Sequence, residues 1–242
     1  DDDLSRGLGD VYKRQNELFD FDGGDVTGSI DGEGGINTLQ LDNVQNTVEI
    51  TGDDSGTAMP AIAGTFDDIN NIVGGTDDDL FDLNNGTLSG GINGGGGTGD
   101  TLQLDDGVNV VVVTGADEGA ATGLGDGFTA VPNINGGSDV DTVVIAGGSI
   151  TGSVDGGGGT DDELQLDSGN NTVNITGADS GDATNVAAFS GIENIEGNDG
   201  DDTFNIASGG SLTGGIDGED GNDTLAQGGD ADTFTVDGAG SG

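Results

Sequence analysis

The sequence contains no cysteine, histidine or tryptophan, and it has only three lysine and arginine residues against 47 aspartate and glutamate residues. Without histidine or cysteine, the chain cannot form the common zinc sites or a Ser-His or Cys-His nucleophile pair. The scarcity of positive charge argues against nucleic-acid binding, because Lys and Arg contacts to phosphates dominate that affinity. Apolar runs are short, as from Val110 to Val113, and too short to span a membrane.

The balance of apolar residues and charge lies close to that of disordered proteins. Leucine, isoleucine, valine and phenylalanine together make up less than a quarter of the chain, and the formal net charge is -44. A fraction below roughly 20% with high net charge is typical of disorder, and a compact chain of this charge repels itself. The composition therefore predicts an unfolded chain, a fold neutralised by bound cations, or a protein adapted to strong salt.

The three basic residues, Arg6, Lys13 and Arg14, all lie near the start of the chain. The abrupt change of composition after this segment predicts that residues 1–15 are a non-native leader. The string from Leu4 to Gln15 also resembles translated adapter sequence. A genuine basic arm is the alternative interpretation.

The rest of the chain is built from a long internal repeat. Equivalent apolar positions, at Phe19, Phe81, Val143 and Phe204, recur at spacings of 62, 62 and 61 along the sequence. We predict repeats at residues 16–75, 76–137 and 138–198, with a partial fourth at 199–242. Self-similarity at a fixed period is typical of stacked repeat architectures.

Within each repeat, apolar residues alternate with polar ones, as in Phe81-Asp-Leu83 and Leu102-Gln-Leu104. This alternation predicts short strands with one buried face, and no segment shows a helical period. We expect an all-β fold, a parallel β-solenoid with about three coils of ~20 residues per repeat. A series of small β-sandwich domains, one per repeat, is the alternative.

Aspartates recur two residues before the first core residue of a strand. These residues are Asp79, Asp100, Asp141, Asp162, Asp202 and Asp223. The distances between successive members are 21, 41, 21, 40 and 21 residues. A gap of 21 predicts that two of these aspartates lie side by side on neighbouring coils. A gap of about 41 predicts a span of two coils.

Each of these aspartates follows a glycine cluster, as in Gly136-Gly-Ser-Asp-Val-Asp141-Thr-Val143. The pattern resembles the repeats-in-toxin (RTX) nonapeptide of secreted bacterial proteins, Gly-Gly-x-Gly-x-Asp-x-apolar-x, and this resemblance implies Ca²⁺ binding. Carboxylate and carbonyl oxygens are the ligands that Ca²⁺ prefers. The motifs are single rather than tandem, and Asn37 replaces the aspartate in the first repeat. The candidate metal ligands are Asp77, Asp79, Asp100, Asp139, Asp141, Asp162, Asp202 and Asp223, with a second row at Asp54, Asp117 and Asp179.

The expected function is structural. We predict a calcium-binding, adhesin-like or filament-like segment of a secreted or cell-surface bacterial protein, with Ca²⁺ and further copies of itself as the expected partners. Aspartate and glycine are also ordinary turn residues, so a Ca²⁺-independent acidic solenoid from a halophile, or a self-assembling fibre, is the alternative. A polysaccharide-binding module is less favoured. No cationic or histidine partner is available for the carboxylates after Gln15, so we expect no enzyme.

Overall fold

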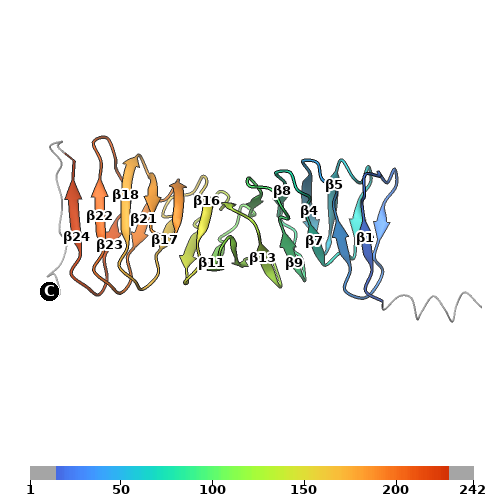
Figure 1. Cartoon of the computed structure of the whole chain (residues 1–242), viewed down its shortest axis with the longest axis horizontal. Coiled ribbons are helices and arrows are strands. Elements are labelled where there is room, and N and C mark those ends of the chain that lie inside the picture. Colours follow the sequence, from blue (N-terminus) through green and yellow to red (C-terminus); the bar gives the residue numbers. More distant parts are fainter. Residues whose placement is uncertain (1–14, 229–242) are drawn as a thin grey trace, which may run out of the picture.

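The computed structural model describes residues 15–228, which form 24 strands in two sheets and no helix. The predicted leader lies outside the described residues except for Gln15. The strands stack along one long axis, with β1 (Leu18–Asp20) at one end and β24 (Thr224–Gln227) at the other (Figure 1). No helix capable of crossing a membrane lies between residues 15 and 228. The all-β prediction is confirmed.

Both sheets are mostly parallel. The 11-stranded sheet contains, in spatial order, β1, β3 (Thr38–Gln40), β7 (Asn71–Val73), β9 (Gly91–Asn93), β13 (Gly127–Thr129), β12 (Glu118–Ala121), β11 (Val110–Gly115), β15 (Thr142–Ile145), β17 (Glu163–Gln165), β21 (Asn194–Glu196) and β23 (Ile216–Asp217). The 13-stranded sheet contains β2 (Ile30–Asp31), β6 (Phe66–Asp67), β5 (Ser55–Met59), β4 (Thr47–Gly52), β8 (Leu80–Asp82), β10 (Thr101–Gln103), β14 (Asn133–Asn135), β16 (Ile150–Asp155), β20 (Val186–Ser190), β19 (Ser180–Ala183), β18 (Thr172–Gly177), β22 (Thr203–Ile206) and β24.

The core is a continuous row of apolar side chains from both sheets. Burial alternates along the strands, as the sequence predicts: Val111 and Val113 of β11 are buried, whereas Val110 is exposed. Equivalent core residues stack on neighbouring strands, so Phe81 of β8 lies beside Leu102 of β10. Each strand therefore needs only one or two apolar residues, which is how a chain so poor in them builds a core.

The sequence spacing between paired strands is not constant, as three equal coils per repeat would require. Leu80 pairs with Thr101 and Thr142 with Glu163, and both pairs have the expected spacing of 21. Thr101 instead pairs with Asn133, and Val110 with Thr142, across a longer stretch of sequence. The prediction of equal coils is wrong at these positions.

An antiparallel hairpin accounts for the longer spacing. Three successive strands stay within one sheet in each complete repeat, namely β4–β5–β6, β11–β12–β13 and β18–β19–β20. Elsewhere, successive strands alternate between the two sheets. The first and third hairpins lie in the 13-stranded sheet and the second in the 11-stranded sheet. Successive repeats therefore place equivalent strands on opposite sheets.

This alternation also corrects the interpretation of the longer gaps between the aspartates. Asp100 precedes β10 in the 13-stranded sheet, whereas Asp141 precedes β15 in the 11-stranded sheet. The two residues are not stacked two coils apart, because the hairpin takes up residues that a further coil would have used.

Candidate functional site

The aspartates that precede the core strands form acceptor rows, defined here as polar side chains that accept hydrogen bonds from the backbone of the preceding strand. The N–H of Asp79 donates to Oδ1 of Asp100 at 2.8 Å. The same contact joins Asp141 to Asp162 at 2.7 Å and Asp202 to Asp223 at 3.0 Å. The predicted neighbours are therefore confirmed, and a carboxylate links each pair of strands.

Three asparagines donate to acceptor-row aspartates from the preceding strand, although the sequence motifs did not mark them as functional residues. The N–H groups of Asn46, Asn109 and Asn171 each donate at 2.7 Å to Oδ1 of the next row member, which is Asp79, Asp141 and Asp202 respectively. Their amide groups also donate to turn carbonyls, for example from Asn109 to the carbonyls of Asp105 and Gly107. Their constant place before Val48, Val111 and Val173 was the signal available in the sequence.

Glycine is required where the acceptor rows cross the turns. A Cβ atom on Gly136 would lie closer than 3.0 Å to Oδ2 of Asp141 and to the carbonyl oxygen of Gly156 on the next strand connection. Both distances are far shorter than a van der Waals contact. The glycine and aspartate therefore recur in phase because the carboxyl group and a neighbouring backbone occupy the space of a side chain.

Four buried carboxyl oxygens of the acceptor rows accept no hydrogen bond within residues 15–228. They are the Oδ2 atoms of Asp100, Asp141, Asp162 and Asp202, whose side chains are at most 2% exposed. Oδ2 of Asp141 faces the same space above Gly136 as the Gly156 carbonyl. Two acceptors without a donor between them are unfavourable, so this space suits a proton, a cation or a hydrogen-bond donor.

Asn37 shows what a donor does at this position. Its N–H donates to Asn70 and its Oδ1 accepts from the N–H of Glu17, so it is a row member like the aspartates. Its Nδ2 donates to the carbonyls of Gly32 at 2.9 Å and Asp68 at 2.8 Å. The amide thus donates to backbone carbonyls, which an ionised carboxylate oxygen cannot do.

The environment of these carboxyl groups disfavours their charged form. Burial raises the pKa of Asp100 from its ordinary value of 3.8 to about 6, even though the hydrogen bond from Asp79 lowers it. The nearby carboxylates of Asp79 and Asp78 also raise it. Burial is likewise the main cause of the raised pKa of Asp141, Asp162 and Asp202.

The predicted second row occupies the turns of the three hairpins. Asp117 has a positive φ of 53°, and its carboxylate accepts from the N–H and the hydroxyl of Thr151, both at 2.7 Å. The equivalent pairs are Asp54 with Ser89 and Asp179 with Thr213. We call these pairs hairpin clamps. Both oxygens of each carboxylate accept a hydrogen bond, so these side chains fasten one repeat to the next.

The remaining candidates, Asp77 and Asp139, are exposed in the turns. Within the described part of the chain, no group of three or more acidic side chains is arranged to hold a metal ion. The oxygens around the unpartnered Oδ2 atoms are of the type that Ca²⁺ binds, but each space contains one carboxyl group, and Ca²⁺ takes six to eight oxygens. The oxygens at these positions are therefore of the chemical type that Ca²⁺ binds, but they are too few to complete its coordination.

Comparison with protein-family models, with curated proteins and with solved structures finds no match to this chain.

Proposed function

We propose that residues 16–228 are a structural segment, a β-solenoid rod within a secreted or cell-surface bacterial protein. The observation that carries this proposal is the repeated use of polar side chains as acceptor rows and hairpin clamps. Equivalent contacts recur in each complete repeat, as with Asn46, Asn109 and Asn171. A repeat-to-repeat contact of this kind suits a scaffold whose length matters more than any single site.

Catalysis is not supported by the same residues. A glycosidase needs two carboxyl groups that face an accessible substrate. The acceptor-row carboxyls of Asp79, Asp100 and Asp141 are buried, and they accept backbone hydrogen bonds instead. No copy of the motif differs from the others in a way that would mark an active site.

Calcium binding is the second candidate, favoured by the four unpartnered Oδ2 atoms and by the resemblance to RTX repeats. Asp100 and Asp162 would hold the ion through Oδ2, with backbone carbonyls as further ligands. Bound Ca²⁺ would supply positive charge to a chain that has none after Gln15, and millimolar extracellular Ca²⁺ would promote folding.

Circular dichroism and small-angle scattering with EGTA, then with CaCl₂, then with NaCl of equal ionic strength, distinguish the two candidates. The structural proposal expects a β-rich rod already with EGTA in moderate salt. If the chain is a coil with EGTA and with NaCl and becomes a β-rich rod only with Ca²⁺, the Ca²⁺-dependent fold is the correct candidate. An extended coil under all three conditions would contradict both.

The matched variants are Asp100→Asn, which changes a buried row member, and Asp77→Asn, which changes an exposed turn residue. If Ca²⁺ binds at the acceptor rows, isothermal titration should show loss of a site in Asp100→Asn and no loss in Asp77→Asn. Equal titrations for both variants would place any bound Ca²⁺ elsewhere.

A further inference from the structure

One surface of the rod departs from the polar character of the rest. The outward-facing positions of β11 and β15, and of the turns before them, carry Val108, Val110, Val112, Val140 and Val144, which we call the valine patch. Val110 pairs with Thr142 and Val112 with Val144, so these side chains lie on two adjacent strands. Val108 is 67% exposed, Val110 47% and Val140 40%.

The equivalent positions of the other repeats are polar or charged. The pair Val112 and Val144 corresponds to Glu49 and Asp82 one repeat earlier, and to Asn174 and Asn205 one repeat later. The core positions between them stay apolar in all three repeats. The fold therefore does not require valine on the outside of these strands. Because exposed apolar groups in adjoining positions are typical of interaction surfaces, the difference points to binding.

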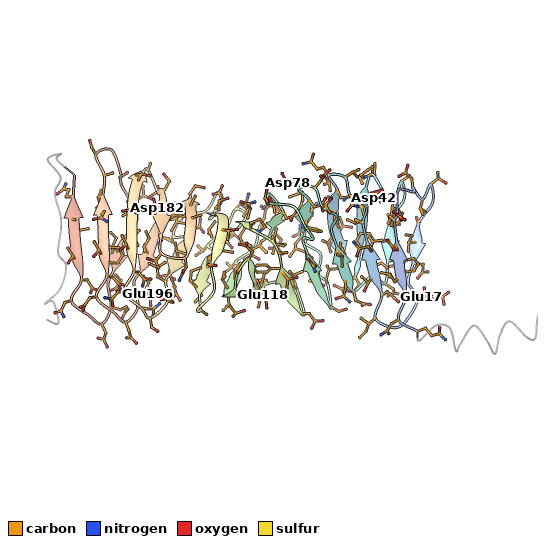
Figure 2. All side chains as sticks on the ribbon, viewed as in Figure 1. Glu17, Asp42, Asp78, Glu118, Asp182 and Glu196 are labelled. Carbon is orange, nitrogen blue, oxygen red and sulfur yellow. The ribbon has the colours of Figure 1, made fainter. Side chains whose placement is uncertain are left out.

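Carboxylates border the valine patch. Glu163 of β17 lies directly beside Thr142, and the exposed Asp106 and Asp139 lie in the turns that precede β11 and β15. Glu118, at the hairpin turn, is exposed near the other end of β11. Acidic side chains also extend along the whole rod, from Glu17 near one end to Glu196 near the other (Figure 2). The patch is thus an apolar centre with a negative border.

We propose that the valine patch binds a cationic amphipathic segment of another protein, one that presents apolar side chains flanked by lysine or arginine. The apolar side chains would cover the valines, and the basic ones would pair with the bordering carboxylates. Residues 16–242 of a second copy do not fit that description. They have no lysine or arginine, so these parts of two copies would bring like charges together without compensation.

The test uses two synthetic peptides of equal charge, acetyl-Lys-Val-Lys-Val-Lys-Val-Lys-amide and its Lys-Ser counterpart. Their affinities for the full chain are measured by fluorescence anisotropy at about 0.15 M NaCl, where exposed charges are partly screened. We expect the Lys-Val peptide to bind at least about tenfold more tightly than the Lys-Ser peptide, because only the former buries apolar surface.

The variant Val110→Thr, Val112→Asn, Val144→Asn copies the residues found at the equivalent positions one repeat later, so folding should be preserved. It should abolish the preference for the Lys-Val peptide. The control Val44→Asn alters a valine that is 41% exposed outside the patch and should leave the preference unchanged.

Equal affinity for the two peptides in the wild type, or a preference that survives the triple substitution, would overturn the proposal. Analytical ultracentrifugation of the wild type and the triple variant tests whether a second copy of the chain binds the patch instead. A concentration-dependent dimer that only the triple substitution removes would assign the patch to a second copy and would also overturn it.

Discussion

Asp100 shows how a single carboxyl group is divided between two roles in this chain. Its Oδ1 accepts the N–H of Asp79 and so joins two strands, while its Oδ2 is buried without a donor. The first role stabilises the stack and the second opposes it. The same division applies to Asp141, Asp162 and Asp202.

Replacement of the unpartnered oxygen by a donor should stabilise the protein. In Asp100→Asn, Oδ1 can keep its hydrogen bond and the new amide can donate to a facing carbonyl, as Asn37 does. We expect the free energy of unfolding in EGTA to rise by about 1 kcal/mol in urea titrations. The reverse change, Asn37→Asp, should lower it by a similar amount. A destabilised Asp100→Asn would mean that the charged carboxylate itself is required.

The raised pKa of Asp100 predicts a pH dependence of definite sign. Because the folded pKa of about 6 exceeds the ordinary value of 3.8, the folded state binds the proton more tightly than the unfolded state. Stability from this group should be fully present below pH 3.8 and lost as the pH rises to about 6. Urea titrations at constant ionic strength should show a shallower decline over this window in Asp100→Asn than in the wild type. Equal slopes would contradict the assignment.

Glycine at the crossing of acceptor row and turn should tolerate no side chain. Gly136→Ala would place a methyl group against the Asp141 carboxyl and the Gly156 carbonyl, so we expect a loss of more than about 2 kcal/mol. The control is Gly158→Ala, where the nearest atom to the new Cβ is 4.0 Å away. Thermal unfolding of both variants measures the difference, and similar melting temperatures would argue against close packing at Gly136.

At the scale of elements, each hairpin is held to the next repeat by its clamp. Asp117→Gly keeps a residue suited to the positive φ of this turn but removes both hydrogen bonds to Thr151. We expect it to lower the free energy of unfolding by about 1–3 kcal/mol. Thr151→Val should cost less, because it removes only the hydroxyl bond. The double variant should be less destabilised than the sum of the two, and strict additivity would show that the pair does not interact.

Strand positions could be predicted from the sequence, because alternation of apolar residues, as in Leu102-Gln-Leu104, directly reflects burial on one face. The second strands of the hairpins could not. The segments Ser55–Met59, Glu118–Ala121 and Ser180–Ala183 consist mostly of small and polar residues that have weak strand propensity. Their pairing depends on the turns at Asp54, Asp117 and Asp179, residues that the sequence pattern presents as metal ligands.

The positions of the acceptor-row aspartates could also be predicted, and so could the contact between close pairs such as Asp79 and Asp100. The hydrogen bonds that span a hairpin could not be derived. The partner of Asp141 is the backbone of Asn109, and the length of chain between them is set by the hairpin. Whether the unpartnered Oδ2 atoms bind a proton or Ca²⁺ stays a prediction.

At the scale of the whole molecule, the excess of negative charge should make stability depend on salt. No positive side chain lies between residues 16 and 242, so nearly all long-range charge interactions within the rod are repulsive. With EGTA present, an increase of NaCl from about 0.1 M to about 1 M shortens the Debye length from about 10 Å to about 3 Å. The urea midpoint should therefore rise with NaCl. A midpoint independent of salt would imply that bound ions already neutralise the carboxylates.

Because the hairpins alternate between the two sheets, an odd and an even number of repeats have different consequences for the molecule. Equivalent strands on the same sheet, such as β7 and β21, are separated by seven strand spacings, or about 34 Å, and by two repeats of sequence. A chain that gained or lost one repeat would move every equivalent strand beyond that point to the other sheet. A gain or loss of two repeats would leave each equivalent strand on the same sheet. Two surfaces carried by equivalent strands of one sheet must therefore be an even number of repeats apart.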